Sequence, residues 1–201
     1  MLPNLEKVID QMGLKANDCH PALPRDKEFR GLGLLGGAIS LEELYFITGV
    51  IATVKPDIVI ELGTAYGGSV VGIASVLKDF GKGEVITVDI ADVPPKTARD
   101  MILANNLPVR FVTGKNSIDF LNELKVEDKI YLVFSDTDIP LRPTEVKLAL
   151  DKLPKGTLVI VHDTSDKHPR GPMDLKNKLG NDYNVVELPT PRGIAIVSKN
   201  G

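Results

Sequence analysis

The segment from Ile58 to Ser69, IVIELGTAYGGS, constrains the fold of this chain more than any other. It begins with β-branched apolar residues, which are typical of a strand buried on both faces of a parallel sheet. Glu61 ends the run, and glycines follow where the backbone must approach a ligand or adopt positive φ. The apolar residues 70–77 then continue as a helix. A strand, a glycine turn and a helix N-terminus in this order predict a binding site for a nucleotide-like ligand with an anionic group.

The length and composition favour one α/β domain. The 201 residues are 43% hydrophobic, which is enough for a sizeable core. The net charge of −3 comes from interspersed acidic and basic residues, so neither a nucleic-acid partner nor a membrane surface is indicated. No apolar stretch approaches membrane-spanning length, and the first residues lack the pattern of a signal peptide. The single cysteine, Cys19, cannot form an internal disulfide, and we therefore expect a cytoplasmic protein.

Beyond residue 54, strand-like and helix-like segments alternate, as in a Rossmann-like doubly wound sheet with helices on both faces. We expect parallel strands at 57–62, 84–89, 109–113, 130–135 and 157–161, and helices at 69–80, 96–105, 117–124 and 144–153. The strands expected at 183–188 and 193–198 leave no room for a helix between them, so they should form an antiparallel hairpin. The sequence therefore predicts a mostly parallel sheet of seven strands that ends in a C-terminal antiparallel hairpin.

We expect residues 1–201 to make a single domain, with a helical N-terminal cap or lid region at 1–53 before a Rossmann-like core at 54–201. The segment Ser40–Glu43 has the pattern of a capping box, and it should begin a helix that runs to about Val54. The glycine-rich apolar loop Gly31–Ala38 comes before it. This loop could be a connection packed on the sheet, a lid near the substrate, or part of a homodimer contact.

Two carboxylates narrow the choice of ligand. Asp89 closes the second expected strand, where a carboxylate accepts hydrogen bonds from the hydroxyls of a ribose. Glu61 lies directly before the glycine turn, where its charge would repel a pyrophosphate but attract an ammonium or sulfonium group. S-adenosylmethionine carries a ribose and both cationic groups, and its carboxylate suits the N–H groups near Ser69. Electrostatics therefore favour S-adenosylmethionine over NAD.

The residues Glu61–Ser69, ELGTAYGGS, resemble the first motif of the catechol-type, metal-dependent O-methyltransferases and of the related cephalosporin-hydroxylase-like methyltransferases. The resemblance extends, with gaps, from about Ser40 to the C-terminus. It implies the seven-stranded methyltransferase fold, with Ser69 at the methionine carboxylate, Asp89 at the ribose and residues 114–117 beside the adenine. The cofactor-binding set that we assign is Glu61, Gly63, Thr64, Ala65, Tyr66, Gly67, Ser69, Asp89, Asn116, Ser117 and Asp136. Asn116 and Ser117 also fit a plain helix N-cap, and the two roles can coexist.

Polar residues at the ends of two neighbouring strands predict a metal site. Asp136 follows the fourth expected strand, and His162 and Asp163 follow the fifth, so level strand ends would bring the three together. Two carboxylates and an imidazole could bind Mg²⁺ or another divalent metal. These positions also match the metal-binding places of the resembled family, and a metal there would lower the pKa of a substrate hydroxyl. The alternative is that the acids cap helices and that His162 bonds a loop carbonyl.

The residue that should act as general base is absent. In catechol-type enzymes a lysine three residues after the first metal-binding acid has this role, but Ile139 occupies that place here. A catechol-like aromatic acceptor is therefore not expected. Asp138, His162 or His168 could serve as the base instead, and Asp136, His162 and His168 are our catalytic candidates.

The leading hypothesis is an S-adenosylmethionine-dependent O-methyltransferase that acts on a hydroxyl of a small molecule. An aromatic content of 5% and the absence of tryptophan favour a small or sugar-like acceptor. An NAD-dependent oxidoreductase is a second hypothesis, because the spacing from the glycine turn to Asp89 fits that cofactor, although the compact GxGxxG pattern is missing. A non-catalytic domain that binds S-adenosylmethionine is a third, since Ile139 replaces the expected base.

Overall fold

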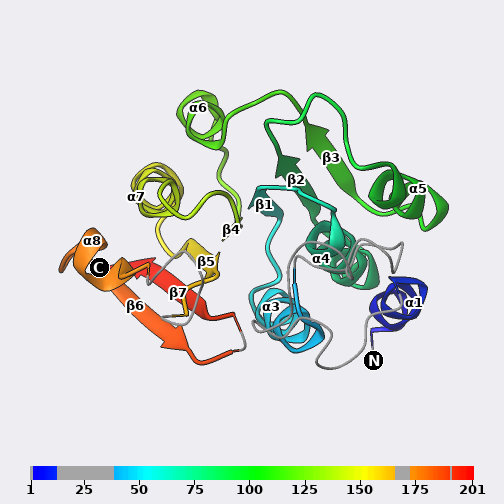
Figure 1. Ribbon diagram of the computed structural model, residues 1–201, viewed down its shortest axis with the longest axis horizontal. Helices are drawn as coiled ribbons and strands as arrows, with labels where there is room; N and C mark the ends of the chain where they lie inside the picture. Colours follow the sequence, from blue (N-terminus) through cyan, green and yellow to red (C-terminus); the bar gives the residue numbers. More distant parts are fainter. Residues whose placement is uncertain (1, 13–38, 166–172, 191) are drawn as a thin grey trace, which may run out of the picture.

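A seven-stranded sheet lies at the centre of the computed structural model, which describes residues 2–12, 39–165, 173–190 and 192–201 (Figure 1). The strands are β1 (Ile58–Leu62), β2 (Glu84–Val88), β3 (Val109–Val112), β4 (Tyr131–Ser135), β5 (Leu158–His162), β6 (Tyr183–Leu188) and β7 (Ile194–Lys199). Their order is β3-β2-β1-β4-β5-β7-β6. Strands β1 to β5 are parallel, and β7 runs antiparallel to both β5 and β6. The predicted Rossmann-like sheet with a C-terminal hairpin is confirmed.

Helices cover both faces of this sheet. One face carries α1 (Pro3–Met12), α3 (Leu41–Val54), α4 (Gly68–Phe80) and α5 (Lys96–Ala104), and the other carries α6 (Ser117–Glu123), α7 (Arg142–Lys152) and α8 (Leu175–Leu179) (Figure 1). Strand β1 shows why its run must be continuously apolar: Ile60 and Leu62 join one hydrophobic cluster, whereas Val59 joins the other. Successive side chains of a strand face opposite sides, so a sheet covered twice buries all of them.

Most predicted elements lie within a residue or two of their observed bounds. The exceptions are informative. Helix α7 begins at Arg142 rather than at residue 144, with Pro143 in its first turn, where no intrahelical bond depends on a proline N–H. Helix α8 was not predicted, because five residues are too few to show a helical period.

The predicted capping box is present at the start of α3. The Ser40 hydroxyl oxygen accepts a hydrogen bond from the Glu43 N–H at 3.1 Å, and Glu43 Oε2 accepts one from the Ser40 N–H at 3.3 Å. The loop Gly31–Ala38, Cys19 and His168 lie outside the described residues.

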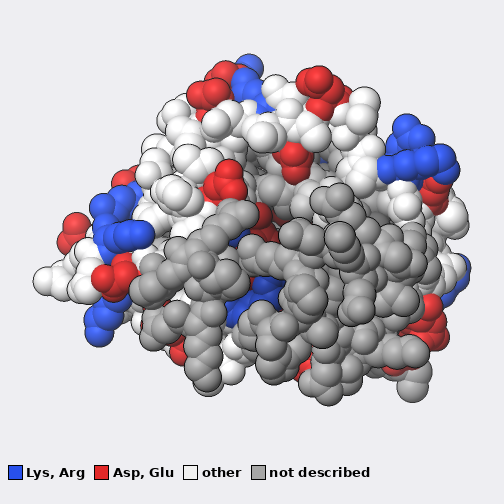
Figure 2. Space-filling model, viewed as in Figure 1, with Lys and Arg blue, Asp and Glu red and all other residues white. Residues whose placement is uncertain are grey.

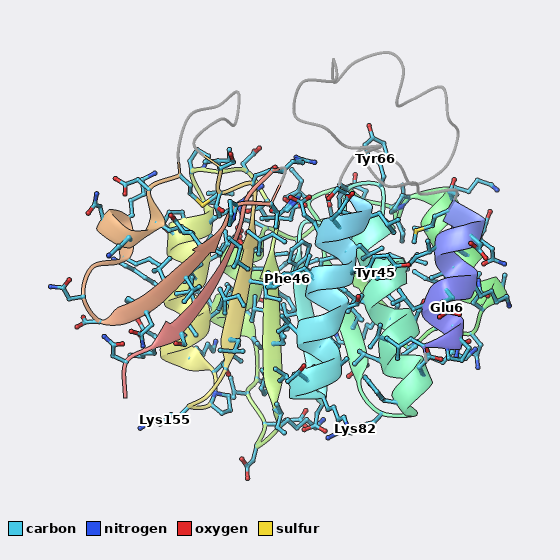
Figure 3. All side chains as sticks on the ribbon, turned by 90° about the horizontal axis from the view of Figure 1, so that it is seen from below. Glu6, Tyr45, Phe46, Tyr66, Lys82 and Lys155 are labelled. Carbon is cyan, nitrogen blue, oxygen red and sulfur yellow. The ribbon has the colours of Figure 1, made fainter. Side chains whose placement is uncertain are left out.

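The strand order reverses between β1 and β4, and in open α/β sheets ligands bind at such a switch point, outside the carboxyl ends of the strands. We call the carboxyl ends of β1, β2, β4 and β5, with the turns that follow them, the crest. Figure 3 shows Tyr66 at this end of the sheet and Lys82 and Lys155 at the opposite end. Tyr66 is 52% exposed, so the crest reaches solvent.

On the face drawn in Figure 2, the lysine and arginine side chains of the described residues lie among aspartates and glutamates, and neither sign of charge dominates. Within the described parts of the chain, no helix is long and apolar enough to cross a membrane.

Candidate cofactor site and ion-pair network at the crest

The glycine turn exists because two backbones approach each other closely. Gly63 has a φ of +94°, and a Cβ atom there would lie 2.7 Å from the carbonyl oxygen of Asp136. Gly67, at the start of α4, has a φ of +82°, and a Cβ there would lie 2.4 Å from that of Ala98. Any side chain at either position would force the neighbouring element away, so β1, β4 and α5 can meet only around glycine.

Asp89 fixes the glycine turn from the neighbouring strand. Its Oδ2 accepts hydrogen bonds from the N–H groups of Thr64 at 2.9 Å and Ala65 at 3.0 Å, and its Oδ1 accepts one from the Ala91 N–H at 2.9 Å. Two N–H groups of the predicted ligand cradle are therefore used within the protein. Asp89 is only partly buried, so its carboxylate also has room to accept hydrogen bonds from a ribose.

Glu61 is fully buried beneath the turn. The hydroxyls of Ser69 and Thr87 each donate to it at 2.5 Å. Burial outweighs these hydrogen bonds and raises the pKa of Glu61 to about 8. At neutral pH the carboxyl group therefore keeps its proton, and its attraction for a cationic ligand is weaker than a charged carboxylate would exert. Since the Ser69 hydroxyl is committed to Glu61, a ligand carboxylate at Ser69 would use the free N–H groups in the first turn of α4.

The residues expected beside the adenine are tied into the fold. Asn116 Oδ1 accepts a hydrogen bond from the Ile118 N–H at 2.8 Å, so the N-cap interpretation of this residue is confirmed. The Ser117 hydroxyl donates to Glu145 at 2.5 Å. Glu145, which is fully buried in α7, also accepts from Ser135 at 2.5 Å and from Thr137 at 2.7 Å. This carboxylate joins α6, the end of β4 and the crest into one unit.

The structure brings the three predicted metal ligands together. Ser135 pairs with Val161, so the next residues along the two strands, Asp136 and His162, lie side by side. Single donor atoms of Asp136, His162 and Asp163 all lie within 4.8 Å of one another. Asp163 has a φ of +56°, a conformation that residues other than glycine seldom adopt and that often occurs at functional sites.

Three further charged residues complete this cluster, and none was predicted to belong to it. Arg192 pairs with Asp163 at 2.6 Å, Arg142 with Asp136 at 3.0 Å, and Glu43 with His162 at 3.1 Å. Each of these residues has a local role that accounts for it in the sequence, so the sequence gives no sign of its contacts with distant residues. Glu43 belongs to a capping box, Arg142 begins a helix, and Arg192 lies in the turn of a hairpin.

Mutual charge sets the protonation of this network. Burial by itself would raise the pKa of Glu43, but the hydrogen bond and charge of His162 lower it to about 2. Burial opposes the protonation of His162, yet the charge of Asp136 and the hydrogen bonds to Asp136 and Glu43 raise its pKa to about 9. The pKa of Asp163 falls to about 2 against burial, because His162, Arg192 and Arg142 surround it with positive charge. At neutral pH we therefore treat His162 as a cation and both carboxyls as anions.

The candidates for general base are placed very differently. His162 has no exposed side-chain surface and both of its ring nitrogens face carboxylates, so we do not assign it as a base toward a substrate. Asp138 is exposed at the crest. Ile139 is 7% exposed and packs in the hydrophobic cluster beside α7, which explains why no lysine occupies this position.

The chain is similar in sequence to known methyltransferases. A profile described as rhamnosyl O-methyltransferase/CmcI matches residues 38–169, more than half of the chain. Rhamnosyl O-methyltransferases of Mycobacterium tuberculosis (strain H37Rv) and Mycobacterium bovis (strain BCG Pasteur) are each 28% identical to it over 141 residues. The match covers 65% of this chain and 55% of the relatives, so the chain spans about half the length of these relatives.

Solved structures share the fold. The O-methyltransferase TomG from Streptomyces achromogenes, in complex with SAM, aligns with a TM-score of 0.66 at 18% identity over 86% of each chain. An O-methyltransferase from Bacillus cereus in complex with SAH aligns with a TM-score of 0.64 at 19% identity, over 99% of this chain and 90% of the other. At these identities the likeness concerns the architecture.

Proposed function

Because the chain belongs to the rhamnosyl O-methyltransferase/CmcI family, we propose that it is an S-adenosylmethionine-dependent O-methyltransferase acting on a hydroxyl of a small molecule. The family match over residues 38–169 carries this proposal, since that segment contains the glycine turn, Asp89 and the ends of β4 and β5. The matched relatives are named for a rhamnosyl acceptor, so a sugar-like hydroxyl is the first acceptor class to test.

The proposed reaction transfers one carbon. The acceptor oxygen attacks the methyl carbon of the sulfonium group as the carbon–sulfur bond breaks, which yields a methyl ether and S-adenosylhomocysteine, while the hydroxyl proton passes to a base. The protein contributes alignment of the two reactants and exclusion of water.

The cofactor would lie along the crest. Its carboxylate would face the first turn of α4, its ribose would bind Asp89, and its adenine would lie beside Gly114–Ser117, in agreement with the family resemblance of these residues. Tyr66, half exposed beside the turn, would cover the bound cofactor. Asp138 is our candidate for the base among the described residues, because it is exposed at the carboxyl end of β4. His168 remains a second candidate from the sequence.

A divalent metal receives no step in this scheme. The donors Asp136, His162 and Asp163 are close enough for an ion, but each already faces an oppositely charged side chain. The chemistry of the donor set is therefore that of an ion-pair network.

Ligand binding tests the cofactor assignment. We expect S-adenosylhomocysteine to bind in isothermal titration calorimetry, and a concentration of 100 times its Kd to raise the free energy of unfolding by about 2.7 kcal/mol. NAD should do neither. Stabilisation by NAD but not by S-adenosylhomocysteine would favour the oxidoreductase alternative, which the family match does not support.

Turnover tests the chemistry. With radiolabelled S-adenosylmethionine and a panel of sugar and other small hydroxyl acceptors, we expect label in a methyl ether, and Asp138→Asn should reduce kcat by roughly 10²-fold. Asp128→Asn, at another exposed aspartate, is the matched control. Binding without turnover across the whole panel would favour the non-catalytic alternative. A homodimer and a cytoplasmic location are also proposed, and light scattering and cell fractionation would test them.

A further inference from the structure

The resemblance to metal-dependent O-methyltransferases implies a divalent cation between Asp136 and Asp163. In this chain two arginine side chains, Arg142 and Arg192, bring positive charge to that place beside the imidazole of His162. The Arg142 guanidinium contacts both acids and the backbone around them, and the Arg192 guanidinium contacts Asp163.

Arg192 holds Asp163 in a two-point contact. Its Nε lies 2.6 Å from Asp163 Oδ1 and its Nη2 lies 2.8 Å from Oδ2, so each carboxylate oxygen receives its own N–H. Such two-point contacts are among the strong hydrogen-bonded pairs that arginine and carboxylate make. A metal ion that used Asp163 would therefore have to share this carboxylate with the guanidinium group or displace it.

Arg142 lies between the two carboxylates that a metal ion would join. Its Nη2 is 3.0 Å from Asp136 Oδ1 and 3.5 Å from Asp163 Oδ2. Its Nε donates to the Thr137 carbonyl oxygen at 2.8 Å, and its Nη1 donates to the carbonyl oxygen of His162. Arg142 is the first residue of α7, and its side chain is only 3% exposed. These contacts and this burial hold the guanidinium group in place.

Arg192 is equally constrained through its backbone. Its N–H donates to Glu43 Oε1 at 2.9 Å, and its carbonyl oxygen accepts from the Ser165 N–H at 3.0 Å. Gly193 comes next, and a Cβ there would lie 2.1 Å from the Ser165 nitrogen. The turn before β7 is therefore pressed against the segment after β5, which fixes the guanidinium over Asp163.

His162 does not offer a nitrogen to an ion in this arrangement. Its Nδ1 lies 3.1 Å from Asp136 Oδ1, and its Nε2 lies 3.1 Å from Glu43 Oε2. Both ring nitrogens are directed at carboxylate oxygens, whereas a metal-bound imidazole directs one lone pair at the ion.

We propose that Arg142 and Arg192 occupy the electrostatic place of a divalent cation at the crest, so that the protein itself neutralises Asp136 and Asp163. The crest then folds and keeps its geometry without a bound metal. This inference concerns ion binding, so it holds or fails independently of methyl transfer.

The test is a metal titration of the full chain after dialysis against EDTA and then metal-free buffer. Free Mn²⁺ is measured by its electron paramagnetic resonance signal, and the unfolding temperature is recorded with EDTA, Mg²⁺ and Mn²⁺. We expect the wild type to bind no stoichiometric Mn²⁺ and its unfolding temperature to be the same in all three. One equivalent of tightly bound Mn²⁺ that is lost in Asp136→Asn would overturn the proposal.

Variants of Arg192 separate charge from shape. Arg192→Gln removes the cation over Asp163, and we expect its affinity for Mn²⁺ to rise at least about tenfold over that of the wild type. Arg192→Lys retains the charge and should gain no Mn²⁺ affinity. Arg99→Gln, at an arginine 51% exposed on α5, is the matched control for loss of a positive charge elsewhere. A folded Arg192→Gln protein with unchanged Mn²⁺ affinity would contradict the proposal. If this variant does not fold, the Mn²⁺ affinities of the wild type and of Arg192→Lys test the proposal.

Discussion

At the scale of single residues, Glu61 shows how burial changes the protonation state of an acid in a sequence motif. The carboxyl group lies under the glycine turn with its pKa raised to about 8, mainly because burial disfavours its charged form. An acid whose pKa is higher in the folded state than its ordinary 4.5 destabilises the fold progressively as the pH rises from about 4.5 to 8.

Glu61→Gln should therefore stabilise the protein at neutral pH but have little effect near pH 4.5, where the wild-type carboxyl group is protonated in the folded state and half protonated in the unfolded state. We expect a gain on the order of 2–3 kcal/mol in the free energy of unfolding at pH 7. Urea denaturation of both proteins between pH 4.5 and 8.5 measures it. A difference in the free energy of unfolding between the two proteins that does not change with pH would contradict the raised pKa of Glu61.

Gly63 is the residue on which the crest depends sterically. Its φ of +94° and the 2.7 Å that would separate a Cβ atom from the Asp136 carbonyl oxygen leave no space for a side chain. We expect Gly63→Ala to lower the free energy of unfolding by about 2 kcal/mol or more and to weaken binding of S-adenosylhomocysteine. Gly49→Ala is the control, because Gly49 lies within helix α3 and a Cβ there meets nothing within 4 Å. That change should stabilise the protein by about 0.5–1 kcal/mol, and equal effects at the two glycines would contradict the steric argument.

At the scale of elements, Glu43 connects three parts of the chain that are distant in sequence. One oxygen accepts from the Ser40 N–H and faces His162 Nε2, and the other accepts from the Thr190 hydroxyl at 2.8 Å and the Arg192 N–H at 2.9 Å. Helix α3, strand β5 and the turn before β7 are therefore held by one buried carboxylate.

Glu43→Gln should loosen this junction. A buried charge that loses its partner costs about 3 kcal/mol, so we expect a loss of that order at pH 7 in urea denaturation. Hydrogen exchange should rise in the turn before β7 and in the first turn of α3. Glu6→Gln, at an exposed position in the first turn of α1, should change stability by less than about 0.5 kcal/mol, and similar losses in the two variants would argue against the junction.

At the scale of the whole molecule, the buried network sets the pH at which the fold is most stable. Glu43 and Asp163 have pKa values lowered to about 2, so the stability that they contribute is lost as the pH falls below their ordinary values of 4.5 and 3.8. His162 has a pKa raised to about 9, so its contribution is complete below pH 6.5 and is lost as the pH rises toward 9. The effect of Glu61 also decreases stability above pH 4.5.

Together these groups predict maximum stability near about pH 5, with a decline on both sides. Chemical denaturation at intervals from pH 3 to 9 measures the curve. A maximum above pH 8 would contradict the protonation states assigned to the network.

The architecture could be predicted from local pattern. Apolar runs of strand length, helix starts at Pro95 and Ser40, and two adjacent strands with no room for a helix between them are all signals carried by neighbouring residues. The glycine turn and the placement of Asp136, His162 and Asp163 at strand ends followed from the same pattern, because parallel strands end at one edge of a sheet.

The sequence by itself therefore determined the sheet and the acids and imidazole that gather at the crest, beside the proposed cofactor site. Only the tertiary structure decided the partners of those groups. Glu43, Arg142 and Arg192 meet at one place although 149 positions separate the first from the last, and each has a sufficient local role of its own. Pairing between distant side chains depends on how α3, α7 and the turn before β7 pack around the sheet. For that reason the three residues that the sequence predicts as a metal site belong, in the folded chain, to a larger ion-pair network made by the protein itself.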